Sequence, residues 1–233
     1  MAYGFNGITG NLDSRSGMLS QSESFEYDNL TKRRLQKVMQ NNTEKMRIDY
    51  DSIGNITSKT DLGEYAYHST KKHAVETVEN TAGLISTGQF ITWNAFQKAT
   101  NLKDTVAGNA YDLNIIYGPD QQRWKTVLKK NNSVAKTTIF AGNYEKITEG
   151  NVTQQLYYIS GGDGLAAVLV KTGSQQDIYY AHTDHLGSII SLTGDNGSPV
   201  FKAEYDAWGK QTITNNTFKF HRGYTGQIGR AHV

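Results

Sequence analysis

Short segments in which apolar and polar residues alternate recur along the chain. Each segment ends in an aromatic residue, usually followed by Asp or Asn, and then by turn residues and a second alternating segment. Copies of this pattern, some of them degenerate, lie at residues 25–30, 48–56, 91–96, 116–124 and 203–210. The pairs Tyr27-Asp28 and Tyr50-Asp51 are 23 positions apart, and Trp93 and Tyr117 continue near that period. The pattern predicts a repeat protein.

Each copy is typical of a β-hairpin. Alternation puts every second side chain of a strand on one face, and Gly or Asn in the turn lets the chain reverse. The acidic residue after the aromatic one can accept backbone N–H bonds and cap the turn. Because one hairpin buries too little apolar surface to be stable alone, successive hairpins must stack. We therefore predict an all-β fold, a long coiled antiparallel sheet with Tyr and Trp packed between units.

Several segments outside the repeats have less definite patterns. Residues 14–24, 41–45 and 129–133 are polar and are predicted to be solvated loops or hairpin tips. Residues 30–39 carry apolar positions at helical spacing, but a strand after the Tyr27-Asp28 turn explains them equally well. Residues 73–79, with Val75 and Val78, are ambiguous between helix and strand in the same way.

Composition favours β-structure and excludes several classes of protein. The 233 residues include 23 Gly and 14 Tyr but only 2 Pro, and none is Cys, so disulfides and thiolate chemistry are excluded. Lys and Arg number 24 against 22 Asp and Glu, without the dense basic patch of a nucleic-acid binder. No apolar run is long enough to span a membrane, and residues 1–10 lack the features of a signal peptide.

An ordered series of motifs resembles the RHS (rearrangement hotspot) or YD-repeat proteins of bacteria. It starts at residues 179–188, Tyr-Tyr-Ala-His-Thr-Asp-His-Leu-Gly-Ser, and ends at residues 224–227, Tyr-Thr-Gly-Gln. Between them lie Leu192-Thr193, Asp195-Asn196-Gly197, Tyr205-Asp206 and Trp208-Gly209. The series is similar to the opening of the RHS repeat-associated core, and the preceding residues are similar to the looser repeats upstream of such cores. The resemblance divides the chain into a YD-repeat β-sheet region, residues 1–178, and the start of the core, residues 179–227.

This resemblance implies containment as the function. In the family, the repeats wind into a hollow β-shell around a variable C-terminal toxin, and the core closes the shell near the point where the toxin is cut off. Self-cleavage in the family depends on acidic residues beyond the Tyr-Thr-Gly-Gln segment. No cleavage residue is therefore assigned to any position of this chain.

Residues 228–233 depart from the family pattern, which continues with acidic residues and a Gly-Leu segment. They match the translation of a widely used sequencing adapter, ATC GGA AGA GCA CAC GTC, and are expected to be a non-native tail. The natural protein is expected to be longer at both ends.

His182, Asp184 and His185 are close together and are residue types that bind metals. On a strand, His182 and Asp184 would share a face and could hold a zinc ion, but no third ligand is evident. The favoured interpretation is structural, namely turn capping and hydrogen bonding at a strand end; a metal hydrolase is the alternative, and it requires a tightly bound metal. Ser188 nearby could suggest a catalytic triad, but no nucleophile elbow surrounds it.

Two other features have a structural and a functional interpretation. Residues 161–164, Gly-Gly-Asp-Gly, lack the Lys-Ser/Thr and the helix of a phosphate-binding loop, so a hairpin turn between strands at 156–159 and 165–170 is predicted. A series of aromatic residues could stack on sugars, but cross-strand packing is the simpler account. The series comprises Tyr27, Tyr50, Trp93, Tyr117, Trp124, Tyr158, Tyr180 and Tyr205.

We expect a structural segment of a bacterial polymorphic toxin that acts in competition between bacteria. The segment is expected to have no enzymatic activity, catalytic residue, cofactor or metal of its own, and its parent is expected to be secreted or on the cell surface. The expected partner is the enclosed C-terminal toxin domain of the parent; neither nucleic acid nor a membrane span is expected. The alternative is a cell-surface adhesin or carbohydrate-binding repeat module. Unpaired strand edges in the isolated segment are expected to make it aggregate.

Overall fold

The computed structural model confirms the all-β prediction. It describes residues 2–18, 21–28, 33–70, 72–73, 75–79, 90–96, 98–162, 164–218 and 220–226. These residues form antiparallel strands and one 3-10 turn at Tyr224–Gly226. None of them belongs to a helix that is long and apolar enough to cross a membrane.

The strands form two sheets, where the sequence predicted one long sheet. The chain divides into unit 1, Met1–Ile85, and unit 2, Ser86–Val233. The division falls where the repeat is weakest, because no aromatic-Asp pair occurs between residues 68 and 90 to mark a further hairpin. The predicted boundary between residues 178 and 179 falls inside a strand of unit 2 and stays a prediction.

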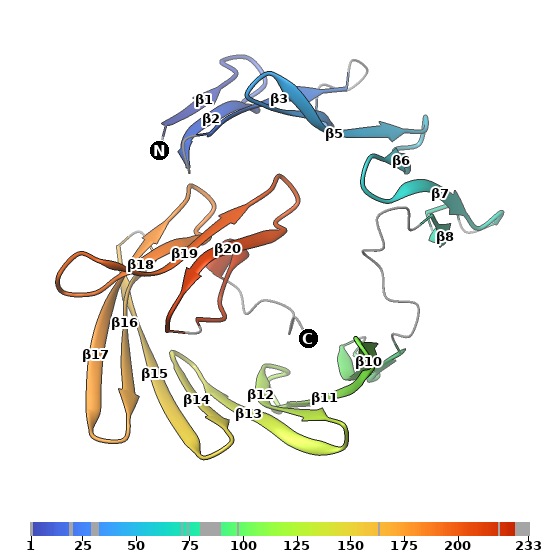
Figure 1. The fold of residues 1–233 in the computed structure, drawn as a ribbon. Coiled ribbons are helices and arrows are strands. Elements are labelled where there is room, and N and C mark those ends of the chain that lie inside the picture. The colour runs from blue at the N-terminus through green and yellow to red at the C-terminus, as the bar shows by residue number, and fades with distance from the viewer. Residues whose placement is uncertain are drawn as a thin grey trace. The chain divides into compact units, whose positions relative to one another are not determined.

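Unit 1 is an eight-stranded sheet in which consecutive strands are hydrogen-bonded neighbours (Figure 1). Its strands are β1 (Ala2–Phe5), β2 (Leu12–Met18), β3 (Gln21–Tyr27), β4 (Leu35–Gln40), β5 (Thr43–Tyr50), β6 (Ile56–Lys59), β7 (Gly63–Tyr67) and β8 (Val75–Val78). The buried apolar residues Phe25, Val38 and Ile48 lie on one face of this sheet. Phe25 pairs with Val38, Val38 pairs with Met46, and Ile48 is two positions after Met46 on β5 and so shares its face.

Unit 2 is a twelve-stranded sheet with the same sequential order. Its strands are β9 (Phe90–Trp93), β10 (Ala99–Val106), β11 (Asn109–Tyr117), β12 (Arg123–Lys130), β13 (Ser133–Ala141), β14 (Tyr144–Glu149), β15 (Val152–Gly161), β16 (Gly164–Thr172), β17 (Gln175–Thr183), β18 (Ile189–Thr193), β19 (Pro199–Tyr205) and β20 (Gln211–Asn216). Purely sequential pairing is expected when each strand is joined to the next by a short hairpin turn.

The hairpin tips show why asparagine recurs between strands. Asn41 and Asn42 join β4 to β5 with φ of 49° and 63°, and Asn131 and Asn132 join β12 to β13 with φ of 49° and 65°. Two successive positive φ values define the type I′ turn, which matches the twist of a hairpin and which Asn tolerates well. The predicted tips are therefore confirmed at residues 41–42 and 131–132, whereas residues 43–45, 129–130 and 133 belong to strands.

The prediction of a solvated loop or hairpin tip at residues 14–24 is wrong for the residues that the structure describes, because 14–18 and 21–24 lie in the paired strands β2 and β3. Polar composition was misleading here: Arg15 is buried, pairs across the strands with Glu23 and lies 5.6 Å from the Phe25 ring centroid. Each of the two ambiguous segments contains a strand and no described helix: β4 begins at Leu35 in the first, and β8 covers Val75–Val78 in the second. Leu30, which contributed to the helical spacing, lies outside the described residues.

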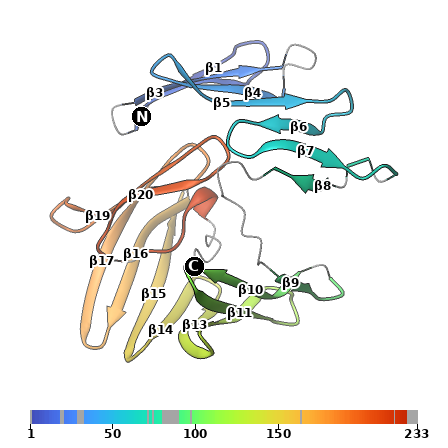
Figure 2. The ribbon, with the colours of Figure 1, turned by 45° about the vertical axis from the view of Figure 1, so that its right-hand side comes forward.

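The main core lies on one face of β14–β19 in unit 2. The chain beyond β20 turns back onto the concave side of this curved sheet (Figures 1 and 2). We call its described residues, 217–218 and 220–226, the closing segment. Phe220 is buried in the core, and Phe218 and Tyr224 pack against it. The closing segment thus gives this part of the sheet a second layer.

Candidate functional site

The Asp or Asn residue of the repeat caps a tight turn, as predicted for the acidic residue. In turns that begin at Asp51, Asn94, Asp184 and Asp206, the side-chain Oδ1 accepts backbone N–H bonds of 2.8–3.0 Å from the residues two and four positions later. The backbone N–H of the same residue donates to the carbonyl four positions later, at 2.9–3.1 Å. Burial works against the charge of Asp51, but the N–H bonds outweigh it and lower its pKa. The turn is one unit reused along the chain.

A glycine with positive φ completes three of these turns. Gly54, Gly187 and Gly209 stand three positions after the capping residue, with φ of 96°, 79° and 79°. Residues with a Cβ are disfavoured in this left-handed region. Gly209 has a second constraint, because a Cβ there would lie 2.7 Å from the ring of Tyr224 in the closing segment.

The tyrosine of the repeat makes a hydrogen bond to the preceding strand, which we call the tyrosine clasp. The tyrosine is the last residue of its strand, and its hydroxyl donates to the carbonyl of the first residue of the strand before it. The described part of the chain contains five clasps of 2.7–2.9 Å: Tyr27 to Leu12, Tyr50 to Leu35, Tyr67 to Ile56, Tyr117 to Ala99, and Tyr205 to Ile189. Burial raises the pKa of Tyr205 to about 12. The clasp holds each strand pair in register.

The rest of the aromatic series has different roles. Trp93, Trp124 and Tyr180 are 61%, 52% and 45% exposed. Tyr158 is buried beside the ion cluster described below. Most of the tyrosines thus belong to the architecture of the sheet, whereas the tryptophans of this series face solvent.

The His182, Asp184 and His185 cluster lies at the end of β17. Asp184 is buried and caps its turn, and an imidazole nitrogen of the exposed His182 lies 3.0 Å from the Thr193 hydroxyl. No three His, Cys, Asp or Glu side chains among the described residues are grouped to hold a metal ion. Ser188 is buried, and its hydroxyl accepts the backbone N–H of Thr225 at 3.1 Å. The geometry of Asp184 and Ser188 is that of a turn that anchors the closing segment.

The glycine-rich segment at 161–164 connects β15 and β16, whose antiparallel pairing ends at Gly161 and Gly164. The predicted strands on both sides are confirmed. Asp163 lies outside the described residues.

A buried ion cluster joins β14 to the closing segment. Glu145 is fully buried, and its Oε1 accepts bonds from Arg222 Nε at 3.1 Å and Nη2 at 2.6 Å. Its Oε2 lies 2.6 Å from His221 Nε2. The Arg222 guanidinium lies 3.5 Å from the ring centroid of Tyr158. Both carboxylate oxygens of Glu145 therefore have a partner, as a buried charge requires.

The electrostatics of this cluster follow from its burial. Burial alone would raise the pKa of Glu145, but His221 and Arg222 outweigh it and the pKa lies below its ordinary value. Burial, and then the negative charge of Glu145, raise the pKa of Tyr158. Such a cluster fixes one geometry, because Glu145 without its partners would be an uncompensated charge in the core.

Further contacts tie the closing segment to the sheet. Asn216 accepts the Phe220 N–H through Oδ1 at 2.6 Å and donates from Nδ2 to the Phe220 carbonyl at 3.1 Å. The Ile189 N–H donates to the Gly223 carbonyl at 3.3 Å. Phe220 packs edge-on against Phe201, with ring centroids 5.3 Å apart.

Sequence reasoning missed the Glu145 cluster. Its members are 76 and 77 positions apart and come from segments with no common motif. One signal was available: Glu145 and Ile147 are two residues apart on a strand, so they share a face. A charged residue on the face that carries the core requires a buried partner.

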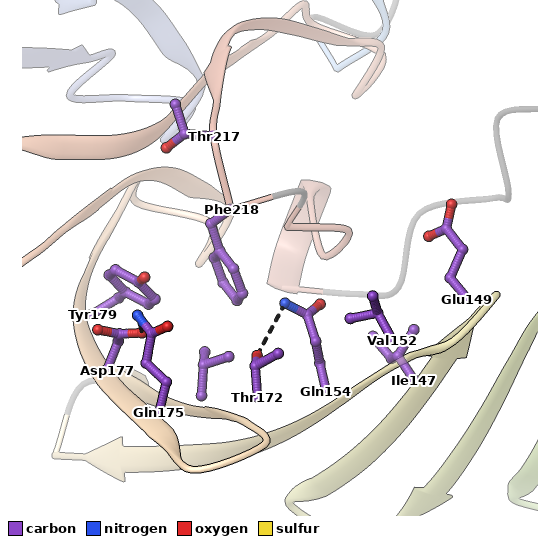
Figure 3. A pocket seen from close by; sticks show the side chains of 11 residues that line it. Ile147, Glu149, Val152, Gln154, Thr172, Gln175, Asp177, Tyr179, Thr217 and Phe218 are labelled. Atoms are coloured by element: carbon purple, nitrogen blue, oxygen red, sulfur yellow. Dashed lines mark hydrogen bonds between the residues drawn. The ribbon is translucent and has the colours of Figure 1, made fainter.

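A trough of about 500 Å³ adjoins the closing segment on the same face of the sheet (Figure 3). Its floor comes from β14–β17, and Phe218 lies over it. Gln154 Nε2 donates to Thr172 Oγ1 at 3.4 Å, and Gln175 Nε2 donates to Asp177 Oδ2 at 3.0 Å. The lining residues are Ile147, Glu149, Val152, Gln154, Val170, Thr172, Gln175, Asp177, Tyr179, Thr217 and Phe218.

The sequence has a family match and a curated relative. Residues 178–215 match the family model described as RHS protein. Over 177 residues the chain is 26% identical to the tRNA3(Ser)-specific nuclease WapA of Bacillus spizizenii. That match covers 72% of this chain but only 6% of WapA, so the chain corresponds to a small part of this relative.

Two solved structures share the fold. A TcdB2-TccC3 crystal structure superposes with a TM-score of 0.57 at 13% identity, covering 98% of this chain and 16% of that one. A Photorhabdus luminescens Tc holotoxin pore with a TccC3 variant gives a TM-score of 0.59 at 12% identity, again covering 98% and 16%. The family match and the WapA relative confirm the predicted resemblance to RHS/YD-repeat proteins, and these structures agree with it in fold.

Proposed function

We propose that this chain is a section of the β-shell wall of a larger RHS toxin, and that the complete shell encloses a C-terminal toxin domain. The wall section performs no reaction of its own. Its task is to supply a continuous surface whose strands stay paired in order. The parent protein is secreted or displayed at the cell surface.

The observation that carries this proposal is the repeated clasp and capped turn. The same two devices recur in both units, with tyrosine hydroxyls on strand ends and carboxylates or amides over the turns. The tyrosine hydroxyls and the side-chain oxygens of Asp or Asn all form hydrogen bonds to the protein's own backbone. Such use of polar groups is expected in a structural wall and not in a reaction centre. The fold shared with the TcdB2-TccC3 structure supports the same role.

The closing segment supports an enclosing function in particular. It lies on the concave side of the unit 2 sheet and is held there by the buried Glu145 cluster. A buried charge pair is specific, because a segment without charges that match Glu145 could not take the place of the closing segment. We call the pairing of Glu145 with His221 and Arg222 the lock. We propose that this lock fixes the path of the chain inside the shell on the way to the toxin.

Protease protection in the complete parent protein tests the proposal. We expect the region downstream of this chain to resist proteinase K in the intact parent, and to be cut rapidly when it is expressed alone or after the parent is unfolded in urea. Equal cleavage rates in the intact parent and in the isolated region would overturn the proposal.

A carbohydrate-binding adhesin is the second candidate, and exposed aromatic residues at one edge of unit 2 favour it. Phe90 and Trp93 on edge strand β9 are 71% and 61% exposed, and Phe96 in the next turn is 63% exposed. Open aromatic faces can stack on sugars. Binding to a glycan array that is lost in Trp93→Ala would favour this candidate over containment.

A further inference from the structure

The trough under Phe218 has polar groups arranged in a row across the strands. By strand register, Gln154 lies opposite Thr172, and Thr172 lies opposite Gln175. The row therefore crosses β15, β16 and β17 at right angles, with an amide at each end and a hydroxyl between them. Side-chain amides both donate and accept hydrogen bonds, as backbone peptide groups do.

The size of the trough suits an extended chain. Its lining spans β14 to β17, and three strand spacings amount to about 14 Å, or about four residues of extended polypeptide. The floor includes Ile147 and Val170, which are buried and apolar. An extended peptide could place alternate side chains on this floor while its backbone N–H and carbonyl groups form hydrogen bonds with the row of amide and hydroxyl groups.

The charge of the trough is negative. Asp177 and Glu149 are among its lining residues, and no Lys or Arg is. Neither carboxylate forms an ion pair within the described part of the chain; Asp177 accepts only the amide of Gln175. Lys136 is opposite Glu149 in register, so Asp177 is the carboxylate with more uncompensated charge. A cationic group is the complement of this end of the trough.

The aromatic residues of the trough disfavour a sugar. Phe218 stacks on Tyr179 with ring centroids 4.8 Å apart and on Phe220 at 5.7 Å, both at an interplanar angle of 28°. Its ring faces are thus in contact with other rings, and its edge points into the trough (Figure 3). A sugar needs an open ring face for stacking, whereas a ring edge, which is weakly positive, suits peptide carbonyl groups.

We propose that this trough binds an extended polypeptide segment carrying a lysine or arginine side chain, with the cation at Asp177 and the peptide backbone along Gln154, Thr172 and Gln175. The inference rests on the proposed function, because an enclosed passenger is the polypeptide that would lie against this face. The trough is then a holding point for the passenger chain.

Fluorescence anisotropy of the full chain with two labelled hexapeptides tests the proposal. The probes are Ser-Gly-Lys-Gly-Ser-Gly and its counterpart with Glu in place of Lys. We expect the lysine peptide to bind at least about tenfold more tightly than the glutamate peptide. In Asp177→Asn, we expect the two peptides to bind with nearly equal affinity. Gln154→Ala should weaken both peptides. Raising the salt concentration should weaken only the lysine peptide.

Matched variants separate the trough from general charge. Gln176→Ala alters the residue next to Gln175 that points to the other face, and Asp195→Asn removes an exposed carboxylate in the β18–β19 turn, which does not line the trough. Both should bind like the unaltered chain. Equal binding of the two peptides, or binding of maltotriose or chitotriose that Gln154→Ala abolishes, would overturn the proposal.

The parent protein distinguishes failure of this inference from failure of the proposed function. If the chain binds neither peptide while the parent still protects its downstream region from protease, the trough proposal is wrong and containment stands. If the chain binds the lysine peptide while the parent leaves that region open to protease, containment is wrong and the trough has another polypeptide partner.

Discussion

Units 1 and 2 are built from the same hairpins but differ in how much they bury. Among its described residues, unit 1 buries three apolar side chains, Phe25, Val38 and Ile48. Unit 2 has a contiguous cluster of buried residues that runs from Ile147 to Phe220. Both units have clasps and capped turns, so these devices do not account for the difference. The closing segment does, because it covers one face of the unit 2 sheet.

Strands β10–β13 of unit 2 support the same conclusion. Among their described residues only Ile115 and Thr138 are buried, although they belong to the same sheet as the core. The closing segment contacts β14, β18 and β19 through Glu145, Ile189 and Phe201. The hairpin repeat alone therefore gives a sheet with few buried residues, and a core forms where the closing segment covers the sheet.

Removing the lock should have the largest effect and should be confined to unit 2. Glu145→Ala leaves Arg222 without its buried partner and is expected to lower the free energy of unfolding by about 3–5 kcal/mol. Denaturant unfolding followed by Trp fluorescence measures this, because Trp93, Trp124 and Trp208 are all in unit 2.

The control lies in unit 1. Glu44 and Arg47 form an exposed ion pair, so Glu44→Ala should cost less than about 1 kcal/mol. Hydrogen exchange of the β4–β5 amides measures the effect. Similar losses in the two variants would mean that Glu145 is not a lock.

Substitutions at two of the three turn glycines, one in each unit, should have effects of intermediate size. Gly54→Ala and Gly209→Ala both place a Cβ at positive φ, which costs about 1–2 kcal/mol. Only Gly209→Ala also drives a Cβ into the Tyr224 ring, so we expect about 2–4 kcal/mol there. Hydrogen exchange in each unit measures the two costs. Equal costs would show that Tyr224 can move aside.

Acid should destabilise unit 2 through Glu145. The folded-state pKa of Glu145 lies below its unfolded value, so its contribution is complete above that value and is lost as pH falls through the folded pKa. Each unit of lowering contributes about 1.4 kcal/mol. We expect Trp-monitored stability to decline from about pH 4.3 downward. In Glu145→Gln, the free energy of unfolding should fall less steeply with decreasing pH. The same slope in the variant and the unaltered chain would mean that other carboxylates cause the decline.

Removing single clasps should have the smallest effects. Tyr50→Phe and Tyr205→Phe each delete one hydrogen bond, worth about 0.5–1.5 kcal/mol. The cost should be near the upper limit for Tyr205, which is buried and also accepts a bond from Gln211 Nε2 at 2.8 Å. Hydrogen exchange of the flanking amides measures both. A larger loss for Tyr50→Phe would contradict the view that burial sets the value of a clasp.

Local structure followed from local residues. Alternation, Asn-Asn tips and the Tyr-Asp pair act over a few positions, so the sequence alone predicted the hairpins, the capping role of Asp184 and the strands around residues 161–164. The polar hairpin at residues 14–24 was missed because Arg15 and Glu23 satisfy each other only after the strands pair. Polarity by itself does not distinguish a solvated loop from a strand with paired charges.

The all-β class, the repeat and the family resemblance were determined by the sequence, because each depends on spacing along the chain. Only the tertiary structure decided that there are two sheets, that residues beyond β20 return to cover one of them, and that Glu145 meets His221 and Arg222. The Glu145 contacts join residues 76 and 77 positions apart, and Thr225 of the closing segment meets Ser188 across 37 positions. Burial and charge pairing select such contacts as the chain folds, and no local pattern specifies them.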